Sequence, residues 1–293
     1  MNTSDKSLYI PPAAYVFLGV FLWSTGGLFI KLTSLDAYQV TFFRSLLAAV
    51  TVAILTRKHG WKINGFGLLT SIFYAVLLFL FVWATKKTTA ANAIFLQYTA
   101  PIYILVLAPF FIGEKFHLRD LLTVILCIGG MSLFFVGKLE IADYQGNIAA
   151  LVSGLFYGLY VMLLRHERGK GMNPTIAVIY GNFLLALVTL PAGVSAVPVM
   201  TWFDLLCVSF LGIIQIGVAY ILFIKGVTLG TRPLDASIIG FIEPLLNPVW
   251  VFFFYGERPS NWAVLGGAII IAAVMFHTLR QYSRRNGVVE NLA

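Results

Sequence analysis

Ten apolar stretches, each long enough to cross a lipid bilayer, follow one another along the chain of 293 residues. A membrane-spanning helix needs roughly 20 such residues, because each residue adds about 1.5 Å along the helix axis. The expected spans cover residues 13–33, 37–56, 65–85, 91–112, 118–137, 146–164, 174–192, 203–226, 234–255 and 260–279. The connections are too short to hold a soluble domain. The sequence therefore predicts an all-α membrane protein with ten transmembrane helices.

The charged residues indicate how the chain is oriented. Only 11% of residues are charged, against about 25% in soluble domains, so the net charge of +8 does not describe a nucleic-acid surface. With the N-terminus inside, the inner segments hold fourteen lysines and arginines and the outer segments five. The positive-inside rule then predicts a multi-pass protein of the inner (plasma) membrane with both termini in the cytoplasm. We expect the first stretch to be retained, because no small-residue cleavage site follows it.

The two halves of the chain resemble each other. Residues 83–130 align without a gap on residues 226–273, at an offset of 143 positions. Pro101 then meets Pro244, and Gly113-Glu114 meets Gly256-Glu257. Five spans separate equivalent positions, and because five is odd, equivalent helices cross the membrane in opposite directions. The sequence thus predicts a 5+5 inverted repeat, with halves at residues 1–140 and 141–293, an architecture suited to alternating access.

Several motifs together resemble the drug/metabolite transporter superfamily, in particular its EamA type. They are Trp23 in the first span, Phe43-Arg44 in the second, Pro101 with Gly113-Glu114 in the fourth, and the segment 241–250 followed by Gly256-Glu257. The resemblance covers nearly the whole chain. Within the family, the chain is similar to bacterial exporters of amino acids and other metabolites. It implies a secondary transporter, and we expect export of amino acids, aromatic ones included, or of related amphipathic compounds. An importer, or an efflux protein for drugs or cations, is the alternative that the resemblance leaves open.

Glu243 is an acidic residue near the middle of the ninth span. A carboxylate at that depth costs a few kcal/mol, so it is expected to face a cavity, bind a cation or hold a proton. A structural hydrogen bond that fixes the helix near Pro244 is the alternative. The equivalent position in the first half is Ala100, so the charge is present in one half alone.

Prolines and polar side chains at similar depth are further candidates for the transport pathway. Pro101 and Pro244 free backbone carbonyls, which are tolerated where they line a cavity or find local partners. Gln97 and Tyr98 lie one turn before Pro101, and Asn247 lies one turn after Glu243. For Asn247, packing between helices is an equal alternative. We expect a central cavity lined by the first, third, fourth, sixth, eighth and ninth spans.

Two tryptophans within spans, Trp23 and Trp83, are candidates for lining a site for aromatic or cationic substrates. Simple packing is the alternative in a chain with 15% aromatic residues.

Arg44 lies roughly 10 Å below the outer end of its span, where snorkelling to the interface or an internal ion pair is favoured over binding a substrate carboxylate. Glu114 and Glu257 end the fourth and ninth spans, and their symmetry favours a structural role, such as capping the next helix.

Motifs for enzymes and metals are missing from the sequence. It contains no Walker A motif, no Ser/His/Asp set and no metal-ligand cluster, and its two cysteines lie far apart. We therefore expect no enzyme activity, catalytic residue, metal or cofactor. A channel is disfavoured because the repeat is internal to one chain. The expected partners are a small-molecule substrate and the lipid bilayer, with protons as an open alternative, and we expect a monomer.

Overall fold

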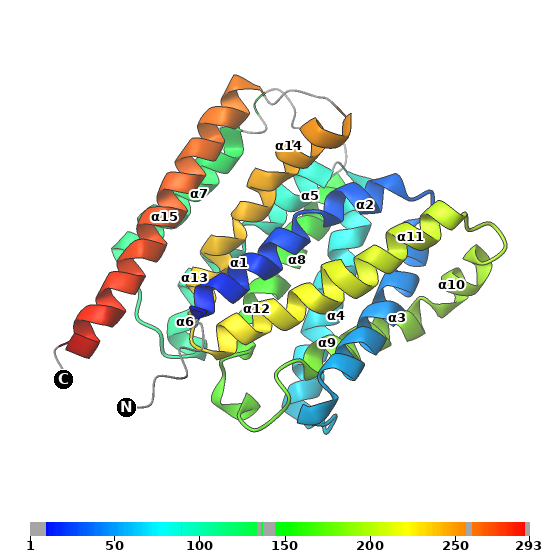
Figure 1. Ribbon diagram of the computed structural model, residues 1–293, viewed down its shortest axis with the longest axis horizontal. Helices are drawn as coiled ribbons and strands as arrows, with labels where there is room; N and C mark the ends of the chain where they lie inside the picture. Colours follow the sequence, from blue (N-terminus) through cyan, green and yellow to red (C-terminus); the bar gives the residue numbers. More distant parts are fainter. Residues whose placement is uncertain (1–9, 89, 134–135, 137–143, 256–259, 291–293) are drawn as a thin grey trace, which may run out of the picture.

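Every regular element in the described part of the chain is a helix (Figure 1). The structure is a computed structural model that describes residues 10–88, 90–133, 136, 144–255 and 260–290, without the side chains of residues 90, 91, 247, 248, 251, 255 and 281–290. The helices before the middle of the chain are α1 (Pro12–Trp23), α2 (Gly26–Leu32), α3 (Ala37–Leu55), η1 (Arg57–His59), α4 (Gly65–Lys87), α5 (Ala90–Gln97), α6 (Ala100–Phe111) and α7 (Leu118–Leu133). Those after it are α8 (Tyr144–Leu163), η2 (Glu167–Gly169), α9 (Ile176–Val188), α10 (Leu190–Ala196), α11 (Trp202–Phe210), η3 (Leu211–Val218), α12 (Ala219–Thr228), α13 (Pro233–Gly240), α14 (Ile242–Tyr255) and α15 (Asn261–Glu290).

The expected all-α membrane fold is confirmed, whereas the number of spans is confirmed only in part. Among the described residues, seven helical segments are long and apolar enough to cross a membrane, and an eighth is added if α9 and α10, bent by 65°, form one span. The expected spans 118–137 and 234–255 are not among them. The first is described as a helix only to Leu133, and the second is divided into α13 and α14.

The two prolines expected to break helices do so at equivalent positions. A proline has no N–H to donate, and its ring clashes with the carbonyl four residues earlier. Four residues before Pro101 stands Gln97, the last residue of α5, and four residues before Pro244 stands Gly240, the last residue of α13. Each proline then lies in the first turn of the following helix, where it is tolerated. The fourth and ninth expected spans are therefore each built from two short helices.

Two other irregularities lie in the first and eighth spans. Between α1 and α2 the hydroxyl of Ser24 donates to the carbonyl of Phe21 (2.6 Å), and that of Thr25 donates to the carbonyl of Leu22 (2.7 Å). Such bonds compete with those of the helix and interrupt it. In the eighth span, η3 is wound as a π-helix between α11 and α12. π-helical turns are rare and often mark functional sites.

Close packing around these breaks depends on small residues. The helix α8 lies against α4, α5 and α6, while α7 lies beside α15 at one edge of the molecule (Figure 1). At Gly154 on α8, an added Cβ would lie 2.6 Å from the carbonyl oxygen of Gln97. At Gly212 on η3, an added Cβ would lie 2.7 Å from the carbonyl oxygen of Arg44 on α3. Both glycines therefore allow backbones to approach more closely than any other residue would.

Candidate functional site

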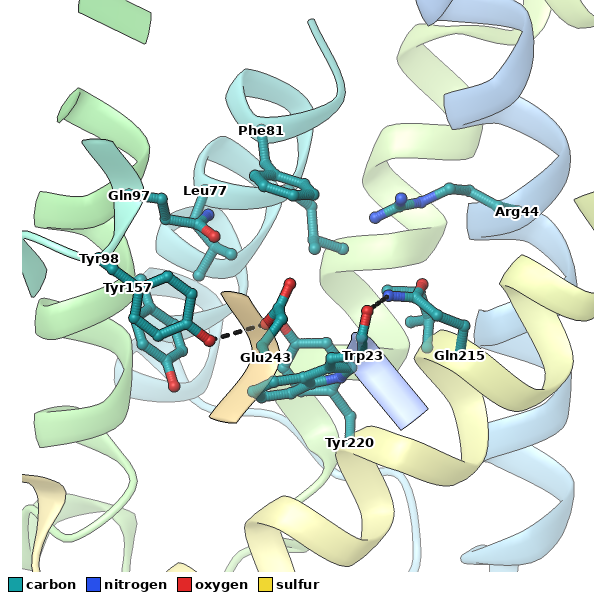
Figure 2. A pocket seen from close by; sticks show the side chains of 12 residues that line it. Trp23, Arg44, Leu77, Phe81, Gln97, Tyr98, Tyr157, Gln215, Tyr220 and Glu243 are labelled. Carbon is teal, nitrogen blue, oxygen red and sulfur yellow. Dashed lines mark hydrogen bonds between the residues drawn. The ribbon is translucent and has the colours of Figure 1, made fainter. Parts of the chain in front are cut away.

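A cavity lies in the interior where the interrupted helices meet (Figure 2). Its polar and tyrosine side chains are Arg44, Gln97, Tyr98, Tyr157, Gln215 and Glu243. Tyr220 is a third lining tyrosine, and the remaining lining residues are Trp23, Leu77, Leu78, Phe81 and Ile216. All six spans that the sequence predicts around the cavity contribute to it, and the second span adds Arg44. The centres of water-sized molecules can occupy about 40 Å³ of it, which is room for roughly three waters.

Glu243 is buried in this cavity, with 6% of its surface exposed. It lies in the first turn of α14, directly after the break that Pro244 imposes. The hydroxyl of Tyr98, at the equivalent break of the other half, donates a hydrogen bond of 2.7 Å to its Oε2 atom. The ring of Tyr98 also packs on that of Phe241, with centroids 5.3 Å apart. Tyr98 and Phe241 are 143 positions apart, at the offset of the sequence alignment, so two aligned positions meet beside the carboxylate.

Arg44 enters the cavity from α3, with only 1% of its surface exposed (Figure 2). Its Nε and Nη1 atoms are buried and have no hydrogen-bond partner among the described residues. The expectation that Arg44 snorkels to the interface is therefore wrong, and no described carboxylate forms an ion pair with it. A charged residue in the membrane interior costs about 3 kcal/mol on insertion scales. The cavity thus holds a guanidinium with two nitrogen atoms that no described residue satisfies, despite that cost.

Three further polar atoms of the cavity lining are buried and find no hydrogen-bond partner within the described part of the chain. They are the indole Nε1 of Trp23, the hydroxyl of Tyr157 and the Oε1 atom of Gln215. The amide nitrogen of Gln215 donates to the carbonyl of Trp23 (3.4 Å), at the end of α1. Buried polar atoms are nearly always hydrogen-bonded, so each exception needs an explanation. Here the unpaired atoms of different helices gather around one cavity.

The other expected site residues are distributed as follows. Gln97 lines the cavity, and its amide donates to the hydroxyl of Ser153 on α8 (2.7 Å). Trp83 lies outside the lining, and the Nζ atom of Lys87 is 5.8 Å from the centroid of its ring. The side chain of Asn247 and all of Glu257 lie outside the described residues.

Sequence reasoning missed Tyr157, Gln215 and Tyr220. Gln215 had a usable signal, because it is the one amide in the stretch 203–226 and stands at its middle, as Glu243 does in its own span. The two tyrosines had none, since a chain with 13 tyrosines offers no reason to prefer these two.

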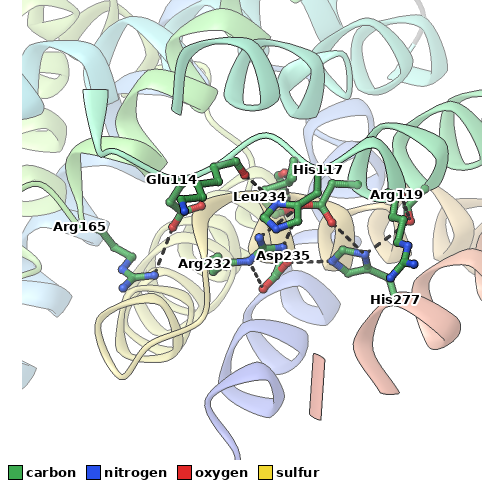
Figure 3. A network of polar contacts seen from close by, with 12 residues as sticks. Glu114, His117, Arg119, Arg165, Arg232, Leu234, Asp235 and His277 are labelled. Atoms are coloured by element: carbon green, nitrogen blue, oxygen red, sulfur yellow. Dashed lines mark hydrogen bonds and ion pairs between the residues drawn. The ribbon is translucent and has the colours of Figure 1, made fainter. Parts of the chain in front are cut away.

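Charged residues form a separate network at one end of the molecule (Figure 3). Arg232 pairs with Asp235 of α13 (2.6 Å) and Asp120 of α7 (3.2 Å). His277 of α15 lies 2.8 Å from the same Asp235, between Nε2 and Oδ1. The network thus ties α7, α13 and α15 together beyond the cavity.

Glu114 lies beside this network and was expected to have a structural role. Its carboxylate pairs with Arg165, two residues after the end of α8 (3.5 Å). Burial raises the pKa of Glu114, and the charges of Arg232 and Arg165 offset part of that rise. The described residues include no group of three or more His, Cys, Asp or Glu side chains that could hold a metal ion.

Comparisons with known proteins agree with this architecture. The model of the EamA-like transporter family matches residues 11–136 and again residues 144–279. An uncharacterized transporter of Archaeoglobus fulgidus is 27% identical over 89% of this chain and 94% of its own length. The pseudopaline exporter CntI of Pseudomonas aeruginosa is 23% identical, over 87% of this chain and 92% of its own length. Solute carrier family 35 member G1 of Mus musculus is 21% identical, over 92% of this chain and 78% of its own length. A solved crystal structure with 17% identity superposes with a TM-score of 0.79, covering 92% of this chain and 97% of the other, which shows a shared fold.

Proposed function

The chain belongs to the EamA-like transporter family, and from this membership we propose that it exports a small amphipathic metabolite by alternating access through the cavity around Glu243. Members of this family are transporters and not enzymes, so the substrate is a small molecule that crosses the bilayer. Amino acids, aromatic ones included, are the substrate class we propose. The protein would act as a monomer in the inner membrane, with its two halves, residues 1–140 and 141–293, related as an inverted repeat.

The observation that carries this proposal is the buried carboxylate of Glu243 at the junction of two interrupted helices. An amino acid carries an ammonium group, which a carboxylate in a cavity of low polarity attracts strongly. The cavity has room for roughly three waters, so a metabolite enters only when the helices around it move apart. The breaks at Tyr98 and Phe241 give α5, α6, α13 and α14 points at which to pivot. Outward direction is supported by the similarity to a protein named as an exporter.

Efflux of an organic cation is the second candidate function. The rings of Trp23, Tyr157 and Tyr220 lie in the cavity lining with Glu243, and aromatic faces attract cations. The two candidates differ in whether the substrate also carries a negative charge.

Replacement of Glu243 by Gln tests the proposal, because it keeps the shape of the side chain and removes its charge. Glu243→Gln protein, purified and placed in liposomes, is expected to insert and fold but to lose pH-dependent or cation-dependent transport of amino acids. Glu167→Gln is the matched control, since Glu167 is an exposed residue paired with Lys170 on a connecting segment. Transport by Glu243→Gln at the wild-type rate, at pH values on both sides of neutrality, would show that Glu243 is structural.

A further inference from the structure

The unpaired polar atoms of the cavity are of two chemical kinds. The guanidinium of Arg44, the indole N–H of Trp23 and the hydroxyl of Tyr157 can donate hydrogen bonds. The Oε1 atom of Gln215 accepts hydrogen bonds and cannot donate them, and among the described residues the carboxylate of Glu243 has one donor, Tyr98. A ligand that satisfies all of them needs both acceptor and donor groups.

Arg44 is the most demanding of these groups, because its charge is permanent. Of the titratable groups that the structure describes, the phenols of Tyr74 and Tyr220 interact with it, and a neutral phenol does not balance a positive charge. The hydroxyl of Tyr74 is already engaged by the amide of Asn182 (3.0 Å). Within the described residues, the guanidinium therefore has neither a counter-ion nor an acceptor for its Nε and Nη1 atoms.

The local backbone holds Arg44 in this position. The helix α3 starts at a capping box in which Asp36 accepts from the N–H groups of Tyr38 and Gln39. On the neighbouring π-helix η3, Gly212 has no side chain and so lets η3 approach the backbone of Arg44 directly. The guanidinium is thus carried on a well-anchored helix and directed into the cavity from the side opposite Tyr98 (Figure 2).

We propose that Arg44 binds the carboxylate of the substrate, so that the cavity selects zwitterionic amino acids whose carboxylate contacts Arg44 and whose ammonium group contacts Glu243. A guanidinium pairs with a carboxylate through charge-assisted hydrogen bonds, and such a pair gives an acceptor to at least one of the Nε and Nη1 atoms, which have none among the described residues. The inference rests on the proposed function, since it assigns a substrate class to the same cavity. Amines that lack a carboxylate have no group to pair with Arg44, so the proposal excludes them as tight ligands of this residue.

Binding of three matched probes to the purified protein tests this assignment. The probes are phenylalanine, phenethylamine, which lacks the carboxylate, and 3-phenylpropionate, which lacks the amine. Arg44→Gln is expected to weaken binding of phenylalanine and 3-phenylpropionate by about tenfold or more, while leaving phenethylamine unchanged. Arg44→Lys keeps the charge but not the fork of donors, so it is expected to restore part of the affinity for the two carboxylates.

The matched control is Arg168→Gln, which removes an exposed arginine of η2 and is expected to change none of the three affinities. Equal weakening of all three probes by Arg44→Gln would make Arg44 a structural residue and overturn the proposal. Absence of binding of either carboxylate to the wild-type protein would overturn it as well. If Arg44→Gln does not fold, unchanged carboxylate affinities in Arg44→Lys would overturn it. If the protein transports phenylalanine but Arg44→Gln does not selectively weaken binding of the carboxylates, the proposed function stands and the role of Arg44 falls. If the selective weakening is seen but the protein transports no amino acid, the binding site stands and the proposed function is refuted.

Discussion

At the scale of single residues, the hydroxyl of Tyr98 determines how Glu243 is held. It is the donor to Oε2, at 2.7 Å, and it comes from the half of the chain that lacks an acidic residue at the equivalent position. Tyr98 is itself 3% exposed and is held by packing on Phe241. The carboxylate is therefore oriented by a residue 145 positions away in the chain, and any motion of the break between α5 and α6 against α14 stretches this bond.

Tyr98→Phe removes the hydroxyl and keeps the ring. We expect the variant to fold, to lose about 1–3 kcal/mol of stability because a buried carboxyl group loses its donor, and to transport several-fold more slowly. Thermal unfolding and liposome transport assays measure the two effects. Tyr38→Phe is the control, since Tyr38 is 47% exposed at the start of α3. A Tyr98→Phe protein as stable and active as the control variant would contradict the role assigned to this bond.

The sequence predicted the depth of the site residues better than the direction in which they point. Trp23, Gln97, Tyr98 and Glu243 lie together in the cavity lining, because position within a span gives depth directly. Trp83 lies outside the lining, since a helix in a membrane bundle is apolar on all sides and its rotation leaves no periodic signal. The same limit made Arg44 look like a snorkelling residue.

At the scale of helices, the site depends on where regular winding stops. The breaks after Gln97 and Gly240 follow from proline chemistry and were predictable from the sequence. The π-helix η3 was not predictable in this way, because the stretch Leu211–Val218 contains no proline. It is formed by packing: Gly212 and Gly217 let η3 lie close against Arg44 and Thr51 of α3.

Gly154→Ala tests the close approach of α8 to the break after α5. The added methyl group would lie 2.6 Å from the carbonyl oxygen of Gln97, so the two helices must separate. We expect the free energy of unfolding to fall by about 1–3 kcal/mol, which lowers the midpoint of thermal unfolding. Gly129→Ala on α7 is the matched control, because its added Cβ meets nothing within 4 Å. Alanine at that position is expected to stabilise the helix by up to about 1 kcal/mol. Equal behaviour of the two variants would argue against tight packing at Gly154.

At the scale of the whole molecule, polar contacts join segments that the charge pattern assigns to the same side. Glu114 pairs with Arg165, and both are assigned to the inside. At the other end, Asp204 accepts from the hydroxyl of Thr33 (2.6 Å), and Lys86 donates to the carbonyl of Thr33 (3.2 Å). These three residues are assigned to the outer side or the outer ends of their spans. The predicted alternation of loops is thus consistent with the fold, although the count of ten spans was inferred from the sequence.

Reporter fusions test which end faces the cytoplasm. A reporter fused after Ala293 is expected to be active in the cytoplasm, and one inserted after Val199, between α10 and α11, in the periplasm. The reason is the excess of lysine and arginine in the segments assigned to the inside. Each fusion serves as the control for the other. Periplasmic activity after Ala293 would reverse or invalidate the predicted topology.

The contact between Tyr98 and Phe241 has a consequence for how a carrier of this kind evolves. Two identical subunits meeting at a two-fold axis would present the same residue twice, and an acid near the axis would face a copy of itself. Like charges that close disfavour each other's ionisation. Two halves joined in one chain can diverge, so that one gives the phenol and the other the carboxylic acid. Gene fusion thus permits a single titratable acid at the centre, which a symmetric ancestor could have only in duplicate.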